Sequence, residues 1–132
     1  CDAIIIDIHG EAASEKQALA NFLDGKVTAI IGTHTHVPTS DLRILPHGTA
    51  YQTDAGMCGD YDSVIGGDKN KWIKNFIKKP GFEKIKPAST NHTMCGVIIK
   101  VFEDTGLSSV AKQLILGDIL QNKIPDEKLF LK

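Results

Sequence analysis

The chain has 132 residues, of which 42% are hydrophobic and 23% are charged, and 15 basic against 16 acidic side chains give a net charge of −1. This size and composition are typical of one compact globular domain and exclude a disordered chain. No apolar run approaches the roughly 18 residues of a membrane span, and the balanced charge argues against a membrane surface or a nucleic acid as partner.

The beginning of the chain predicts two buried strands. Residues 3–8 and 27–31 are mostly apolar runs rich in β-branched residues, a pattern that favours strands covered on both faces. A helix is predicted between them, so the unit is strand, helix, strand. Such a unit is a right-handed parallel crossover in nearly all known cases, and both strands then end at the same edge of the sheet.

The helix between these strands has start and stop signals. Ser14 and Gln17 have the spacing of a capping box, and Gly25 stands where the helix would end. The apolar residues at helical spacing are Ala18, Leu19, Phe22 and Leu23. We expect Leu19 and Phe22 to be core residues.

The rest of the chain predicts a mixture of strands, loops and one further helix. The expected elements are short strands over 42–45 and 49–53, a glycine-rich loop over 54–67, an amphipathic helix over 68–79, and a hairpin of strands over 94–102 and 107–116. The fold class is therefore α/β with a mixed sheet. Seven lysines lie between residues 69 and 86, but no interleaved aromatics of the kind that stack bases accompany them, which favours a solvated helix face over a nucleic-acid surface.

The number and spacing of the cysteines indicate the redox environment of the protein. Cys1, Cys58 and Cys95 are odd in number and form no Cys-x-x-Cys pair. This favours free thiols in a reducing environment over a disulfide framework or a cysteine zinc site. We therefore expect a cytoplasmic protein.

Three histidines follow the two predicted buried strands. His9 ends the first strand, and His34 and His36 follow the second. Side chains alternate along extended chain, so His34 and His36 would project the same way, with α-carbons roughly 6.5–7 Å apart. The crossover brings His9 to the same edge, where ligands bind in open α/β sheets. The pattern predicts a divalent metal site formed by His9, His34 and His36.

Three imidazoles do not define the substrate. They could form a one-ion zinc hydrolase site or contribute to a site for two ions a few ångströms apart. Imidazole accepts Mn, Fe and Zn, so the identity of the metal stays open. Glu11, Thr33 and Thr35 could orient the rings, and Asp7 could do the same or pair with a backbone amide. His47 is interpreted as a surface residue, as is His92.

Longer runs carry a resemblance. Gly32–His36 resembles the Gly-His-x-His motif of calcineurin-like metallophosphoesterases, with one extra residue between the glycine and the first histidine. The runs that resemble the YmdB-type branch of this superfamily are residues 9–18, 32–37, 44–51, 53–57 and 61–66. The resemblance covers about residues 3–116.

The resemblance implies an enzyme and a fold. YmdB-type proteins are similar to 2′,3′-cyclic-nucleotide 2′-phosphodiesterases, which have a four-layer αββα sandwich and a hydroxide activated by two divalent transition metals (Mn, Fe or Zn). It places His9 and His34 on one metal and His36 on the other. The implied substrate is a small-molecule phosphoester, with a cyclic nucleotide as the first candidate, and the substrate-binding residues are not identified.

The family pattern is incomplete in this chain. The remaining ligands of the family are Asp, Glu and Asn residues, and its catalytic His follows one of the Asn residues; none of these matches a position here. Residues 1–132 thus resemble the C-terminal portion of a single domain, half of the sandwich, and we expect an absent N-terminal portion to carry the catalytic acid. The chain alone should have little activity.

Two alternatives to a truncated enzyme need to be weighed, and the first is disfavoured. Asp7-Ile8-His9 could be the opening Asp-x-His motif of a complete domain, but neither Asn91-His92 nor Gly117-Asp118 continues into the motifs that should follow. The chain could also be a non-catalytic metal-binding or assembly module, because such a role does not need the missing ligands. A homo-oligomer is compatible with either.

Overall fold

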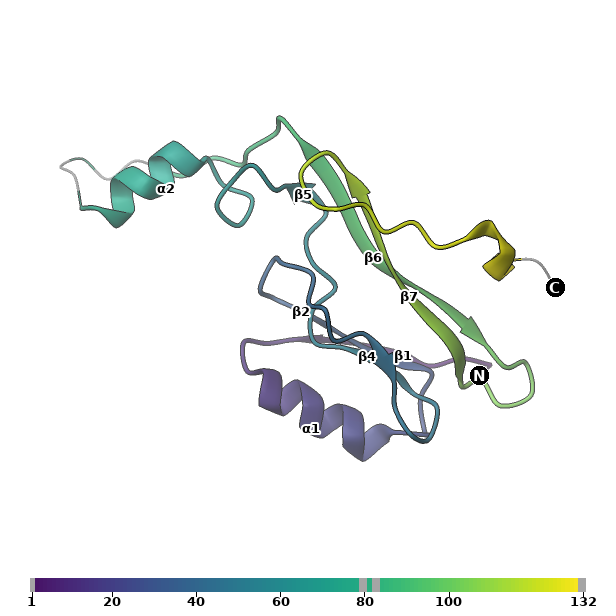
Figure 1. Cartoon of the computed structure of the whole chain (residues 1–132). Coiled ribbons are helices and arrows are strands. Elements are labelled where there is room, and N and C mark those ends of the chain that lie inside the picture. Colours follow the sequence, from purple (N-terminus) through teal and green to yellow (C-terminus); the bar gives the residue numbers. More distant parts are fainter. Residues whose placement is uncertain (1, 79–80, 82–83, 131–132) are drawn as a thin grey trace.

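The computed structural model describes residues 2–78, 81 and 84–130. Its elements are, in chain order, β1 Ile5–His9, α1 Ala13–Leu23, β2 Ala29–Thr33, β3 Arg43–Ile44, β4 Ala50–Gln52, β5 Gly59–Asp60, α2 Lys69–Phe76, β6 His92–Val101, β7 Ser108–Gly117 and a 3₁₀ helix Glu127–Phe130. They form two sheets and two α-helices (Figure 1), which confirms the predicted α/β class.

The first sheet carries the predicted crossover. Its strand order is β1-β2-β4-β3, with β1, β2 and β4 parallel and β3 antiparallel to β4. His9 is the register partner of Thr33, so β1 and β2 end at the same edge. The parallel arrangement and the mixed sheet are both confirmed.

The second sheet is antiparallel, in the order β5-β6-β7. The predicted hairpin is confirmed as β6 and β7. The loop predicted over residues 54–67 is wrong for β5, because Gly59 and Asp60 pair with Thr93 and His92. A strand of two residues has no periodicity that a sequence pattern could reveal.

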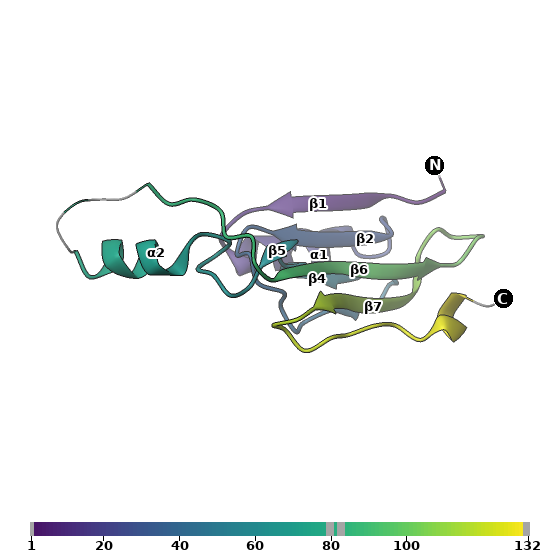
Figure 2. The same ribbon diagram turned by 90° about the horizontal axis from the view of Figure 1, so that it is seen from above.

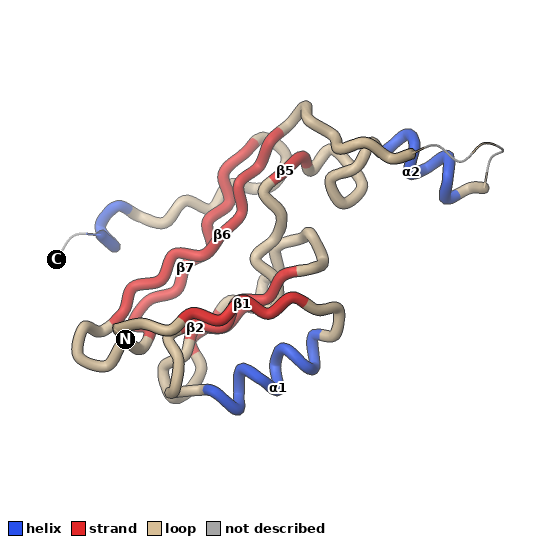
Figure 3. Tube along the Cα trace, turned by 180° about the vertical axis from the view of Figure 1, so that it is seen from behind, coloured by secondary structure: helices blue, strands red, loops and turns tan. Residues whose placement is uncertain are grey.

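The layers are stacked in the order α1, first sheet, second sheet. Ser108 Oγ donates to Thr28 O at 2.8 Å, and Gln113 Nε2 donates to Thr39 O at 3.1 Å, which ties the hairpin to the first sheet. Figures 1 and 3 show the hairpin close to the first sheet where β6 and β7 are joined, and farther from it toward β5. Figure 2 shows α2 projecting beyond both sheets. The described residues thus supply three layers of the expected four-layer sandwich.

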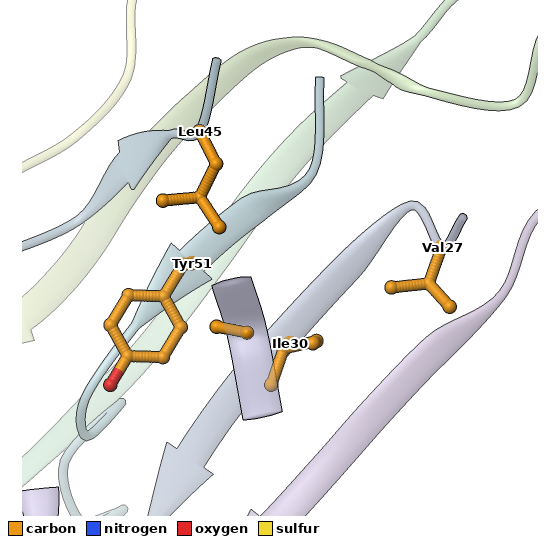
Figure 4. Packing of buried hydrophobic residues seen from close by; sticks show 5 residues of the cluster. Val27, Ile30, Leu45 and Tyr51 are labelled. Carbon is orange, nitrogen blue, oxygen red and sulfur yellow. The ribbon is translucent and has the colours of Figure 1, made fainter. Parts of the chain in front are cut away.

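The main core lies between α1 and the first sheet. Its buried members are Ala20, Val27, Ile30, Leu45 and Tyr51 (Figure 4), and Ile6, Ile8 and Leu23 pack against them. The other face of β1 is not covered in the described part of the chain, where Ile5 is 65% exposed. The expectation that the first strand is buried on both faces is therefore wrong, because β1 is an edge strand with only α1 packed beneath it.

The helices correct two expectations. α1 begins at Ala13, and its N-cap, Ala12, makes no side-chain capping bond, so the predicted Ser14–Gln17 capping box is wrong. α2 begins after Asp68, whose side chain accepts a hydrogen bond from Lys71 N, and it ends at Phe76; residue 79, the predicted end, lies outside the described residues. Neither described helix has the length and apolarity needed to cross a membrane.

Phe22 is not a core residue. It is 70% exposed, and Lys26 Nζ lies 4.5 Å from the centre of its ring. The buried face of α1 passes through Lys16 and Ala20, and Phe22 lies about 200° around the helix from Ala20. Leu19, beside that face, is half-buried.

Candidate metal centre

The three predicted histidines meet at one pocket. His9, His34 and His36 line a cavity of about 200 Å³ together with Thr33, Asp54, Gly56 and Met57. It lies at the carboxyl ends of β1 and β2, where the crossover predicts a site. The shared position is confirmed, and the metal-ligating role stays a prediction.

The backbone around His34 and His36 differs from the expected extended chain. β2 ends at Thr33, and the two histidines have φ angles of +130° and +66°. Both values lie in a region that non-glycine residues seldom occupy. The two residues are therefore not in the predicted extended conformation, and a turn brings their rings to the pocket instead. Backbone outliers of this kind cluster at functional sites.

Gly32, the glycine of the motif, occupies a position that has no room for a side chain. A side chain at Gly32 would strike the carbonyl oxygen of Thr53, and it would also crowd the stem of Lys16. Glycine therefore allows the segment after β4 to approach the end of β2 closely.

The hydrogen bonds around His9 determine which of its ring nitrogens carries the proton. Thr33 Oγ1 donates to Asp7 Oδ1 at 3.0 Å and lies 3.1 Å from His9 Nδ1. An ionised carboxylate only accepts, so the one hydroxyl proton of Thr33 goes to Asp7, and the Thr33 oxygen accepts from His9 Nδ1–H. The lone pair of His9 is therefore on Nε2. This assigns to Asp7 the orienting role that was one of its two expected roles.

A ring nitrogen of His34, Nδ1, lies next to this Nε2 of His9. The Nε2 of His34 lies 2.8 Å from Glu11 Oε2, which can only accept, so Nε2 carries a proton, and in the neutral ring the lone pair is on Nδ1. His34 Nδ1 and His9 Nε2 are 3.1 Å apart, with the rings edge to face. With both rings neutral, two lone pairs face each other, and either a shared proton or a bound cation stabilises that arrangement. The separation is close to the roughly 3.3 Å expected for two imidazoles on one tetrahedral ion with Zn–N bonds of about 2.0–2.1 Å.

His36 has the same pattern with a different partner. Its Nδ1 lies 2.9 Å from the carbonyl oxygen of Ile65, which can only accept, so the lone pair is on Nε2. In metal-ligating histidines the second ring nitrogen usually donates in this way. Among the described residues no group of three or more His, Cys, Asp and Glu is arranged to hold one ion. The donor set is therefore the His9–His34 pair plus a separate imidazole, and it fits a divalent ion at the pair.

Comparison with known proteins identifies the family. Residues 1–114 match the model of the YmdB-like proteins. The chain belongs to this family. It is 44% identical over 115 residues to the 2′,3′-cyclic-nucleotide 2′-phosphodiesterase of Bacillus subtilis (strain 168), a match that covers 87% of this chain and 43% of that protein. It is 56% identical over 77 residues to a putative phosphatase/phosphodiesterase of Mycoplasma genitalium, covering 58% of this chain and 27% of that protein.

Two solved structures are similar to the chain over most of its length. A phosphatase from Mycoplasma pneumoniae is 36% identical, with a TM-score of 0.81 over all of this chain and 45% of that one. A hypothetical protein from Thermus thermophilus is 39% identical, with a TM-score of 0.79 over 89% of this chain and 45% of that one. The resemblance to the YmdB branch is confirmed. The chain spans less than half the length of these relatives.

Two buried charged residues, Asp54 and Lys16, lie at the histidine pocket and were not assigned a role from the sequence. Asp54 is 1% exposed, and its two oxygens accept from Thr35 N and Gly56 N. Lys16 is equally buried, which is unusual for a lysine. A signal existed: Lys16, Ala20 and Leu23 follow the spacing of an apolar helical stripe, so a lysine stands on the inward face.

The other two described histidines lie outside the pocket. His47 Nδ1 is 2.9 Å from Asp24 Oδ2, and the His47 side chain is exposed. His92 is exposed at the start of β6. Both are surface residues, as expected.

Proposed function

We propose that the protein is a metal-dependent phosphoesterase that acts on phosphodiesters, with cyclic nucleotides as its substrate class. One observation carries the proposal: each of His9, His34 and His36 has one ring nitrogen within hydrogen-bond distance of an oxygen atom, and all three residues line a common pocket. The names of the Bacillus subtilis and Mycoplasma genitalium relatives support phosphoester hydrolysis.

The residues have separate roles in this proposal. His9 Nε2 and His34 Nδ1 would hold one divalent ion, and His36 Nε2 would serve a second, with Mn, Fe and Zn as the candidates. Such ions supply Lewis-acid polarisation of phosphoryl oxygens and activate water at neutral pH. Thr33 and Asp7 keep the His9 lone pair on Nε2, and the Ile65 carbonyl does the same for His36.

The chain is proposed to need complementary residues for turnover. An acid must protonate the leaving oxygen, and Asp54, the carboxylate that lines the pocket, is held by backbone amides. The Bacillus subtilis relative is matched over 43% of its length. We propose that the acid and the remaining ligands come from the part of such proteins that this chain does not span.

Hydrolysis of 2′,3′-cyclic AMP with added Mn²⁺ tests the proposal. The 132-residue chain alone should turn over little substrate. Turnover should appear when the unmatched part of the Bacillus subtilis relative is supplied, either fused to the chain or as a separate polypeptide. His34→Ala and His36→Ala should each remove most of that activity, whereas His92→Ala, which replaces an exposed histidine outside the pocket, should leave it unchanged.

Two results would contradict parts of this proposal. Equal rates from the chain alone and from the complemented protein would show that the chain needs no further residues. A complemented protein that binds metal but hydrolyses no phosphoester would favour the alternative, a non-catalytic metal-binding or assembly module.

A further inference from the structure

A buried pair of opposite charges lies beneath the histidine pocket. Lys16 comes from α1, and Asp54 follows β4; each side chain is 1% exposed. Removing both charges from water is expensive, and apolar side chains of similar size often stabilise a fold as well or better. The pair therefore calls for an explanation other than stability.

The two charges bind backbone more closely than they bind each other. Lys16 Nζ is 3.8 Å from Asp54 Oδ2, too far for a hydrogen bond. The same Nζ donates to the carbonyl oxygens of Thr33, at 2.8 Å, and Thr53, at 3.0 Å. Asp54 Oδ2 accepts from Thr35 N at 2.7 Å, and its Oδ1 accepts from Gly56 N at 2.9 Å.

Two of these four bonds hold the peptide groups on either side of His34. The Thr33 carbonyl belongs to the peptide group before His34, and the Thr35 N–H belongs to the peptide group after it. Lys16 holds the first and Asp54 holds the second, so both ends of His34 are fixed. His34 and His36 have φ angles of +130° and +66°, conformations that persist only where the surroundings impose them.

We propose that Lys16 and Asp54 are positioning residues that hold the turn around His34, so that the His34 and His36 lone pairs face the pocket. This rests on the proposed metal-dependent function. The ammonium and the carboxylate do not touch the ion; they act through the backbone that carries its ligands. Charge-assisted bonds suit this task, because they are stronger than neutral ones.

Asp60 provides a matched control. It is another aspartate that is 1% exposed and that accepts backbone N–H groups, but its partners are Thr90, Asn91 and Asp62, outside the pocket. Asp54→Asn and Asp60→Asn should both lower stability toward urea. If Asp54 has a positioning role, Asp54→Asn should also change the tautomers and the Mn²⁺ affinity of the histidines, and Asp60→Asn should not.

Two readouts separate positioning from folding. The first is Mn²⁺ affinity by titration calorimetry, where Lys16→Met and Asp54→Asn should each lose about 10–100-fold and Asp60→Asn should stay near the original value. The second needs no metal: imidazole ¹⁵N shifts in the metal-free protein should show one fixed tautomer for His34 and for His36. That tautomer should become averaged in Lys16→Met and Asp54→Asn, and it should stay fixed in Asp60→Asn.

The outcomes distinguish the inference from the proposed function. If the unaltered chain binds no Mn²⁺, the metal-dependent function fails while the imidazole shifts still test positioning. Folded Lys16→Met and Asp54→Asn variants with unchanged tautomers and unchanged Mn²⁺ affinity would overturn the inference.

Two further measurements cover variants that do not fold. The double variant Lys16→Met/Asp54→Leu leaves no unpaired buried charge, and it should fold with weakened Mn²⁺ binding. In the unaltered chain, the Thr35 amide should exchange slowly with solvent, and exchange at the rate of an open loop would itself overturn the inference.

Discussion

In each histidine of the pocket, one ring nitrogen contacts an oxygen atom, and the chemical type of that oxygen differs among the three residues. His9 uses the hydroxyl of Thr33, His34 a carboxylate, and His36 the backbone carbonyl of Ile65. A hydroxyl is the least restrictive of these, because it could also donate to the ring. The bond from Thr33 to Asp7 removes that freedom, so Asp7 influences a ring that it does not touch.

Thr33→Val tests the hydrogen bonds that link Asp7, Thr33 and His9. Valine keeps the shape of threonine but cannot accept from His9 Nδ1, so the tautomer of His9 is no longer fixed. We expect Mn²⁺ affinity, measured by titration calorimetry, to fall about 10–100-fold, the range seen when partners of ligating histidines are lost. Thr35→Val is the control, because the Thr35 hydroxyl donates to Val37 O and not to a ring. Equal losses in both variants would contradict this role of Thr33.

The pKa of Asp60 predicts an acid-sensitive loop. Hydrogen bonds from the Thr90 backbone and side chain, with others from Asn91 and Asp62, outweigh burial and lower that pKa from 3.8 to about 2. A lowered pKa in the folded state contributes stability above pH 3.8, and this contribution is lost as the pH falls from 3.8 to about 2.

Asp60→Asn should remove this dependence. The variant should be less stable at pH 7, because its amide group would face N–H donors, and its urea midpoint should fall less between pH 5 and about pH 2 than that of the unaltered chain. Asp118→Asn, at an exposed position, should keep the original slope. The same acid slope in Asp60→Asn and the unaltered chain would show that the loss arises elsewhere.

At the scale of elements, local patterns predicted which segments form helices and strands better than which faces are buried. β-branched runs and the crossover rule placed β1 and β2 and brought their histidines to one edge. The helical stripe misassigned Phe22, because spacing shows which residues share a face and not which face meets the sheet. Ile65, whose carbonyl holds His36, lies 29 residues away in sequence, and no local pattern signals such a contact.

The corrected face of α1 predicts a stability contrast. Ile30 is fully buried between α1 and the first sheet, so Ile30→Ala should lower the free energy of unfolding by about 2–5 kcal/mol. Phe22→Ala should cost less than about 1 kcal/mol, because a 70% exposed ring leaves no cavity when it is removed. Urea denaturation of both variants measures the difference. A large loss in Phe22→Ala alone would restore the original assignment.

At the scale of the whole molecule, apolar side chains stay exposed on both sheets. Ile4 and Ile5 are 45% and 65% exposed beside β2, and Met94 and Leu116 are each 46% exposed on the hairpin. The sequence could not reveal this, because a buried-strand pattern does not name the segment that covers it. Relatives with more than twice this length have additional chain that could supply such cover.

The carboxylates near the pocket predict how many metal ions the 132-residue chain can bind. Two dications roughly 3.5–4 Å apart need negative ligands between them, and three neutral imidazoles supply none. Asp54 is held by Thr35 N and Gly56 N, and the Glu11 carboxylate lies against His34 Nε2. No carboxylate in the described pocket is therefore free to bridge two ions, and we expect the 132-residue chain to bind one Mn²⁺ firmly.

Calorimetric titration with Mn²⁺ measures this number, and single variants locate the ion. His9→Ala and His34→Ala should each abolish firm binding, because each removes half of the facing pair of nitrogens. His36→Ala should leave one ion bound, because His36 lies apart from that pair, and His92→Ala should change nothing. Two ions of similar affinity, or binding that survives His34→Ala, would show that the ion sits elsewhere and that the facing lone pairs of His9 and His34 share only a proton.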